Sequence, residues 1–108
     1  MRLRIGDLRH RLALEQAHRV DDDSGGATET WLLVAEVWSA IRATNGDERT
    51  NADQLAARVT HEIWIRRRSG VLPDMRFRRG GRVFEIRAVL DDWQRGRLLR
   101  CLCEERDL

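Results

Sequence analysis

The stretch Val59-Thr-His-Glu-Ile-Trp-Ile-Arg66 alternates between a mainly apolar and a mainly polar set of side chains, and this alternation decides the fold. The odd-numbered residues from 59 to 65 fall on one side, and the even-numbered residues from 60 to 66 fall on the other. A period of two is typical of an antiparallel strand with one buried face and one solvated face. We therefore predict a strand here, with Ile63 and Ile65 in the core.

Other segments show the same strand-like character, and compact turns separate them. Ser69-Gly70, Pro73-Asp74 and Gly80-Gly81 break the second half of the chain, and the last pair favours a two-residue hairpin. An acidic, turn-rich loop from Asp21 to Thr28 lets the first two strands form another hairpin. The predicted strands, besides Val59–Arg66, are Arg11–His18, Trp31–Ala43 with a bend near Ala35, Met75–Arg78, Arg82–Val89 and Arg97–Cys103.

The segment Thr44–Arg58 breaks this pattern. Asn45 is placed to cap a helix, and Glu48 three residues later could reach back to the exposed amide. The apolar stripe of such a helix is thin, so a helix here is marginal on its own. The segment is either a short, loosely docked helix or a mobile loop.

The composition indicates one folded domain spanning residues 1–108. Of these 108 residues, 42% are apolar and 35% are charged, which is typical of a folded chain. No apolar run approaches the length needed to span a bilayer, and the N-terminal residues do not resemble a signal peptide. Cys101 and Cys103 are expected to be reduced thiols that pack in the core, in a cytosolic protein.

Conventional sites of chemistry are hard to find in this sequence. His10, His18 and His61 lack partners at metal-ligand spacing, although His61 with Cys101 and Cys103 could supply three ligands. Core packing is the alternative for His61, Cys101 and Cys103. No serine, carboxylate pair or glycine-rich loop forms a catalytic or phosphate-binding motif. We therefore expect no enzymatic activity, no catalytic or metal-binding residues and no cofactor.

The basic residues offer a different kind of surface. All 20 are arginine, and 18 acidic residues bring the net charge to only +2. A GC-rich genome would explain the arginine bias, yet guanidinium groups also suit carboxylate and phosphate contacts. From Arg66 to Arg82 arginines outnumber acids seven to one, so this segment could face DNA. Alternatively it faces solvent or pairs with the acids of a neighbouring subunit, such as Asp21–Asp23. The candidate DNA-facing residues are Arg66, Arg67, Arg68, Arg76, Arg78 and Arg79.

The four tryptophans are unusual in a chain without tyrosine. Trp38 lies in an apolar stretch and is predicted to be in the core. Trp31, Trp64 and Trp93 lie on more polar sides of their segments or in turns, so we expect them at a subunit or partner interface.

An ordered set of short segments resembles the small head–tail joining family of tailed phages, also called head closure or stopper proteins, with versions in gene transfer agents. The similar segments cover nearly the whole chain, and Thr44–Arg58 matches least. They are Ile5–Leu12, Gly25-Gly26 before Trp31, Val34–Ile41, Thr60–Arg66, Gly70–Arg76 and Gly81–Ile86.

This resemblance implies a mainly β fold, a small antiparallel β-barrel with one short helix or long loop inserted between early strands. It also implies a homo-oligomeric ring of six or twelve copies in the virion neck. The ring would join portal and adaptor proteins on the head side to a tail terminator or tail tube, retain packaged double-stranded DNA and contact no membrane. Assembly would take place in the bacterial cytoplasm.

In such proteins a loop between early strands constricts the channel. The matching positions are Asn45, Gly46, Asp47, Glu48, Arg49, Thr50 and Asn51. Their acids would repel phosphate, so we expect gating by obstruction. The alternatives are a stand-alone nucleic-acid-binding β-barrel, based on the arginine segment, and an enzyme or metal protein.

Overall fold

The computed structural model describes residues 3–44 and 58–106, apart from the side chains of residues 92–94. These ranges form six strands and two 3₁₀ turns. Each strand predicted from the sequence is present, and most are longer than predicted. They are η1 (Ile5–Asp7), β1 (His10–Asp21), β2 (Ala27–Ala43), β3 (His61–Arg66), β4 (Arg76–Arg79), β5 (Arg82–Trp93), η3 (Gln94–Gly96) and β6 (Leu98–Arg106).

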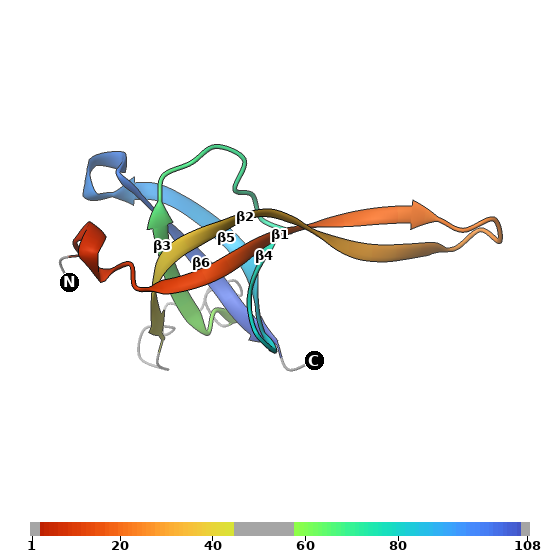
Figure 1. The fold of residues 1–108 in the computed structure, drawn as a ribbon, viewed down its shortest axis with the longest axis horizontal. Coiled ribbons are helices and arrows are strands. Elements are labelled where there is room, and N and C mark those ends of the chain that lie inside the picture. The colour runs from red at the N-terminus through yellow and green to blue at the C-terminus, as the bar shows by residue number, and fades with distance from the viewer. Residues whose placement is uncertain (1–2, 45–57, 107–108) are drawn as a thin grey trace.

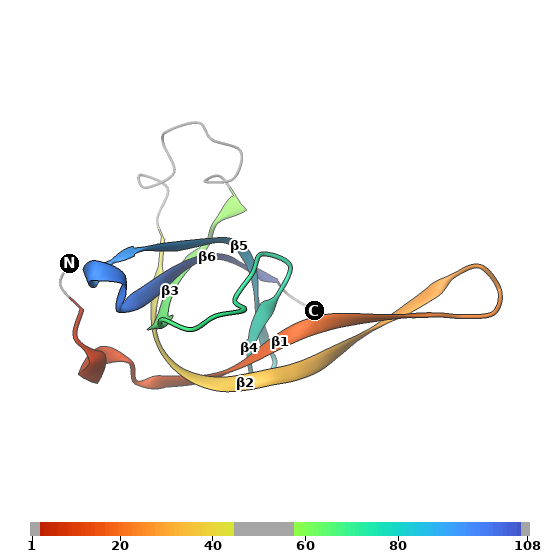
Figure 2. The same ribbon diagram turned by 90° about the horizontal axis from the view of Figure 1, so that it is seen from above.

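The strands close into an antiparallel barrel in the order β1-β2-β3-β6-β5-β4, with β4 hydrogen-bonded back to β1. This confirms the mainly β fold and the barrel (Figure 1). Closure pairs both edges of the sheet, which removes the unpaired edges that an open sheet would expose. The outer parts of β1 and β2 continue well beyond the barrel as a two-stranded arm (Figure 2).

The barrel interior is filled by the inward faces of all six strands. Phe77 lies opposite Leu14 on one side and Phe84 on the other, and all three side chains are fully buried. Burial of each such side chain stabilises the fold by roughly 1.5–3 kcal/mol. The other buried members of this core are Leu12, Ile63, Ile65, Val71, Met75, Ile86, Leu99, Cys101 and Cys103.

Local turn chemistry follows the sequence. Arg79 pairs with Arg82 across Gly80-Gly81, the predicted two-residue hairpin, and Gly80 adopts a φ of 59° that suits glycine. The register of β1 and β2 shifts between Leu14 and Glu15, which leaves Val34 as the extra residue of a bulge. This irregularity lies next to the bend predicted near Ala35.

A second apolar cluster lies on the outside of the barrel. Leu3 and Leu8, from the segment before β1, cover Trp64 together with Ala40 and Leu98. The prediction that Trp64 is exposed at an interface is therefore wrong, because only 1% of its surface is accessible. Local alternation placed Trp64 on the outer face correctly, but it could not show that a distant segment covers that face.

Most of the predicted segment Thr44–Arg58 lies outside the described residues. The backbone N–H of Thr44 donates to the Thr60 carbonyl at 2.9 Å, and the Thr44 hydroxyl donates to the Val59 carbonyl at 3.0 Å. The chain therefore leaves β2 and enters β3 at neighbouring points of the barrel. Among the described residues no helix has the length and apolar character to cross a membrane.

Candidate assembly surfaces

The arm, residues 15–33, exposes apolar side chains that no other described residue covers. It consists of the outer half of β1, the turn after it and the first half of β2 (Figure 1). Val20, Leu32 and Leu33 are 48%, 53% and 61% exposed, and Val34 at the bulge is 41% exposed. An isolated two-stranded ribbon is marginally stable in water, and exposed apolar surface of this kind is typical of a contact with another molecule.

The root of the arm is held by a buried carboxylate. Glu15 is 5% exposed and accepts hydrogen bonds from Arg76 Nε at 2.8 Å and Arg78 Nε at 3.0 Å. Burial alone would raise the pKa of Glu15, but the two guanidinium groups hold this pKa below its usual value. The Arg76 guanidinium also lies 4.0 Å from the centre of the Trp31 ring, so it links the arm to β4.

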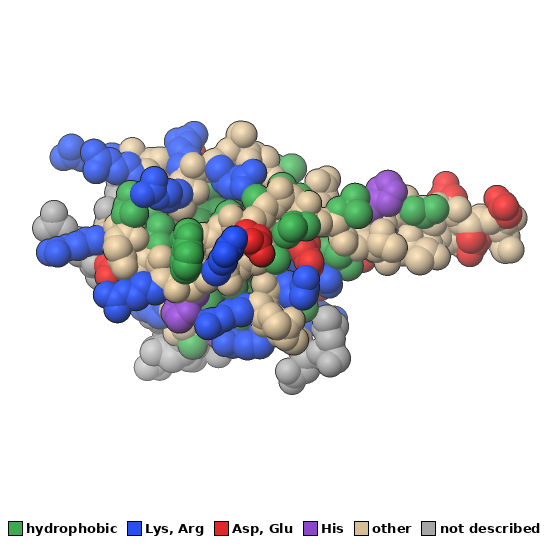
Figure 3. Space-filling model, in the orientation of Figure 1, with side chains coloured by type: hydrophobic (Ala, Val, Ile, Leu, Met, Phe, Trp, Pro, Cys, Tyr) green, Lys and Arg blue, Asp and Glu red, His purple; other side chains and the backbone are tan. Residues whose placement is uncertain are grey.

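The acidic tip, Asp21, Asp22 and Asp23, lies at the far end of the arm (Figure 3). Asp22 builds the turn, because its carboxylate accepts the backbone N–H groups of Ser24 at 3.0 Å and Gly26 at 2.8 Å. Asp21 and Asp23 are exposed and form no ion pair with any residue in the described part of the chain. The tip therefore presents uncompensated negative charge.

The six predicted DNA-facing arginines do not form one surface. In the closed order of strands β3 and β4 are three positions apart, so they lie on opposite walls of the barrel. Arg76 and Arg78 on β4 are bound to Glu15, and Arg79 lies 2.9 Å from His10 Nδ1. Of the three arginines at the end of β3, Arg67 pairs with Asp91 at 3.0 Å.

The remaining two belong to a group that we call the arginine end, which comprises Arg66, Arg68, Arg95 and Arg97. All four are exposed, and within the described ranges none forms an ion pair. Arg95 and Arg97 belong to the connection between β5 and β6, and sequence reasoning missed them because they lie outside the segment Arg66–Arg82. DNA contact by any of these residues stays a prediction.

An apolar hollow of about 290 Å³ adjoins the arginine end, lined by Ile5, Leu8, Trp38 and Arg66. The prediction that Trp38 belongs to the core is wrong, because 56% of its surface is exposed. Its neighbour Ser39 takes the inward position instead, fully buried and donating to the His10 carbonyl at 2.8 Å. The signal for an exposed Trp38 was its position one residue out of phase with Val37, Ser39 and Ile41.

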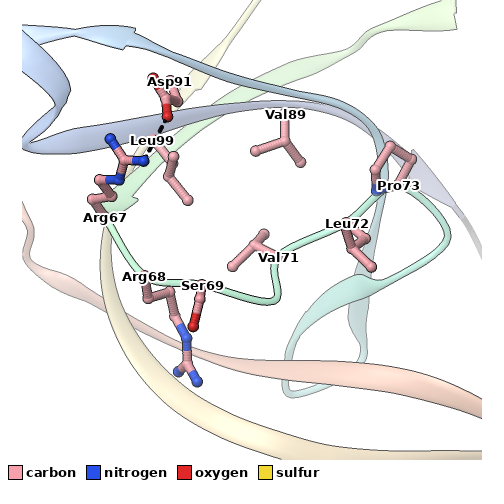
Figure 4. A pocket seen from close by; sticks show the side chains of 9 residues that line it. All are labelled: Arg67, Arg68, Ser69, Val71, Leu72, Pro73, Val89, Asp91 and Leu99. Atoms are coloured by element: carbon pink, nitrogen blue, oxygen red, sulfur yellow. Dashed lines mark ion pairs between the residues drawn. The ribbon is translucent and has the colours of Figure 1, made fainter.

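A second hollow, of about 410 Å³, opens beside the connection between β3 and β4 (Figure 4). Val71, Val89 and Leu99 form its floor, and Arg67 and Asp91 pair at its rim. Val71 and Leu99 belong to the barrel core, so this hollow is a mouth of the barrel. Leu72 at its edge is 60% exposed.

Other predicted interface and gate residues have mixed outcomes. Trp31 is half-buried beneath Arg76, and its role in an interface stays a prediction. The side chain of Trp93 and the gate positions 45–51 lie outside what the structure describes. Nothing in the structure tests their predicted roles.

The cysteines pack in the barrel core as predicted. Cys101 and Cys103 are free thiols with no accessible surface, and burial raises the pKa of Cys101 to about 12. The His61 ring packs edge-on against Phe84 with 5.1 Å between ring centres, and its Nδ1 lies 2.9 Å from the Thr60 hydroxyl. In the described ranges no three His, Cys, Asp or Glu side chains converge as metal ligands.

The comparisons with known proteins identify the family. A model of the phage head completion protein family matches residues 3–106. The chain belongs to the phage head completion protein family. It is therefore a structural protein of a phage-type particle, as the resemblance to head–tail joining proteins predicted.

Two solved structures are similar to this chain over nearly its whole length. A chain in the virion of a native gene transfer agent particle is 32% identical, with a TM-score of 0.68 over 93% of this chain and 96% of that one. The solution structure of protein SF1141 from Shigella flexneri 2a is 29% identical, with a TM-score of 0.75 over 95% and 96% of the two chains. The comparison with curated proteins found no match.

Proposed function

We propose that this protein forms a homo-oligomeric ring in the neck of a phage or gene-transfer-agent particle. The ring lies between the portal or adaptor and the tail, where it retains packaged DNA and provides the surface on which the tail docks. Six or twelve copies would match the symmetry of such a neck. Assembly takes place in the bacterial cytoplasm, before the ring becomes part of the particle.

The observation that carries this proposal is the uncovered arm on a chain of the head completion family. Val20, Leu32 and Leu33 are about half exposed on a ribbon that a monomer leaves in water. Burial of apolar area is the main favourable term in protein association. A ring of copies gives every arm a partner and leaves no copy with an unmatched contact.

The DNA-retaining part of the proposal draws on the arginine end. Arg95 and Arg97 are exposed and form no ion pair with any described residue, so their guanidinium groups can attract phosphate, whereas those of Arg76 and Arg78 are occupied by Glu15. Such attraction needs no base contacts and weakens with salt, which suits a channel through which any sequence must pass.

Deletion of the gene tests the function directly. We expect particles without this protein to be tailless and to lose nuclease-protected DNA, while heads still assemble. Electron microscopy of purified particles and measurement of protected DNA provide the two readings. Normal numbers of tailed, DNA-filled particles after deletion would refute the proposal.

A stand-alone nucleic-acid-binding barrel is the second candidate, favoured by the arginine end, whose four arginines form no ion pair with the described residues. It predicts that the isolated chain binds duplex DNA at low salt and releases it as salt rises. The variant Arg66→Ala/Arg68→Ala should weaken binding, whereas the control Arg76→Ala/Arg78→Ala removes paired arginines and should weaken it less. Absence of binding at low salt excludes this candidate.

A further inference from the structure

The two ends of this molecule carry complementary chemistry. At one end the acidic tip adjoins Val20, whose side chain is 48% exposed and immediately precedes Asp21. At the other end the apolar hollow is lined by Ile5, Leu8 and Trp38 and bordered by Arg66. An apolar side chain beside acids therefore matches an apolar hollow beside arginines.

These two surfaces cannot meet within one copy. The arm points away from the barrel, whereas η1, η3 and the end of β3 lie at the opposite end in both views (Figures 1 and 2). The molecule is elongated, with extents of 51 × 31 × 24 Å. Only another molecule can bring an acidic tip to an arginine end.

We propose that the arm of one copy docks on the next copy of this chain, with Val20 in the apolar hollow. Asp21 and Asp23 then pair with Arg66, which lines this hollow, and with Arg68, two residues further along the chain. This inference rests on the proposed ring and specifies its subunit contact. The hollow, of about 290 Å³, has room for a valine side chain.

A second copy fits this surface better than another partner, because both halves of the contact are present on one chain. A contact between two different patches of identical subunits is heterologous, and it closes into a ring when the rotation between copies allows. It also gives the carboxylates of Asp21 and Asp23 the cationic partners that they lack among the described residues. Such pairing of opposite potentials fixes the orientation of neighbours.

A charge exchange tests the pairing. The variant Asp21→Arg/Asp23→Arg keeps Asp22 and its turn, and Arg66→Asp/Arg68→Asp alters the other surface. Each should reduce the number of tailed, DNA-filled particles by about tenfold or more, because like charges would face each other. The chain that carries all four substitutions should recover most of this loss. If the fourfold variant is as defective as the twofold ones, the pairing is wrong, as it would be if DNA were the partner of the arginines.

A covalent trap tests the hollow. Val20→Cys with Ile5→Cys in one chain should give, on oxidation of intact particles, a ladder of disulfide-linked copies that either substitution alone does not give. The native thiols do not interfere, because Cys101 and Cys103 have no accessible surface. Val20→Cys with Leu72→Cys is the matched control, since Leu72 is 60% exposed but lies away from the hollow.

The outcomes separate this inference from the proposed function. A ring of this protein in the neck, seen by electron microscopy but without the disulfide ladder, overturns the arm contact and leaves the function in place. If wild-type particles contain no copy of this protein in the neck, the proposed function itself is wrong. A ladder that ends in a closed multimer of six or twelve copies supports both.

Discussion

The strands β1 and β2 pass through two regions, the barrel and the arm, in which they keep the same hydrogen-bonded pairing but bury their apolar side chains to very different extents. Within the barrel Leu12 and Leu14 have almost no accessible surface, because β3 and β4 extend the sheet around them. In the arm Leu32 and Leu33 are more than half exposed, because no third strand or facing layer from the described parts of the chain covers them. The same pleated ribbon is thus a core element in one place and a contact element in the other.

The boundary between these regions is marked by two local features. The bulge at Val34 shifts the register, and Glu15 then enters a buried position where Arg76 and Arg78 reach it. Burying a carboxylate is unfavourable unless cations compensate it. The arm can therefore depart from the barrel without leaving a buried charge at its root.

The largest expected effect comes from the barrel core. Phe77→Ala should lower the free energy of unfolding by about 3–5 kcal/mol, because it leaves a cavity between Leu14 and Phe84. Urea denaturation followed by tryptophan fluorescence measures it. The arm control Leu33→Ala should change stability by no more than about 0.5 kcal/mol. Equal losses in the two variants would abolish the distinction between core and arm.

The ion pairs of Glu15 with Arg76 and Arg78 at the root of the arm, which we call the clamp, should give the next largest effect on stability. Glu15→Ala removes hydrogen bonds to two guanidinium groups and should destabilise the protein by about 2–3 kcal/mol. The control is Glu36→Ala, whose pair with Arg11 is about half exposed on both sides and contributes about 1 kcal/mol at most. Chemical denaturation of both variants compares them. A Glu15 variant no less stable than the Glu36 variant would contradict the clamp.

Acid should weaken the fold through the same carboxylate. The folded state holds the pKa of Glu15 below the ordinary value of 4.5, so its contribution is complete above that pH and lost as pH falls through the lowered pKa. Glu104 and Glu105 act in the same direction, because hydrogen bonds from Arg87 and Arg82 lower the pKa of each. We expect Tm to fall between about pH 5 and pH 3.

The variant Glu15→Gln isolates the share of the clamp in this acid effect. Its Tm should fall less over the same pH interval, because it has one fewer group to protonate. Parallel pH profiles of the two proteins would mean that the clamp carries none of the effect.

The smallest effect on stability should come from removing most of the arm. Replacing residues 17–31 by Asn-Gly joins Gln16 to Leu32, which already pair, through a favourable hairpin turn. The barrel loses the contact between Arg76 and Trp31, so stability should fall by about 1 kcal/mol or less. Thermal unfolding measures it. A chain that no longer folds would show that the arm is part of the barrel's stability.

The strands and several turns could be predicted because their signals are local. Period-two alternation located the four strands from Val59 onward, and β-branched and aromatic content located the strand Trp31–Ala43. Alternation also correctly placed Phe77 inward and Arg76 and Arg78 outward. Gly80-Gly81 correctly marked a two-residue turn. The family resemblance added barrel closure, which alternation alone does not predict.

The surfaces were harder to predict because they depend on residues distant in the sequence. Trp64 is covered by Leu3 and Leu8, and Trp38 is left bare, which reverses the prediction for both. No local pattern indicated that Glu15 is buried in an ion pair, because its partners Arg76 and Arg78 lie on β4. The consecutive arginines looked like one basic surface until closure placed β3 and β4 on opposite walls.

Residue order by itself determined roughly where each strand lies, which face of each alternating strand points inward and where the chain turns, because a pleated backbone and its glycine turns are set by neighbours a few residues apart. Only the tertiary structure decided which outer face is covered, which arginines pair with which acids and where the ribbon leaves the barrel. Those outcomes depend on the order in which strands close and on the charges that closure brings together, and no local pattern records either.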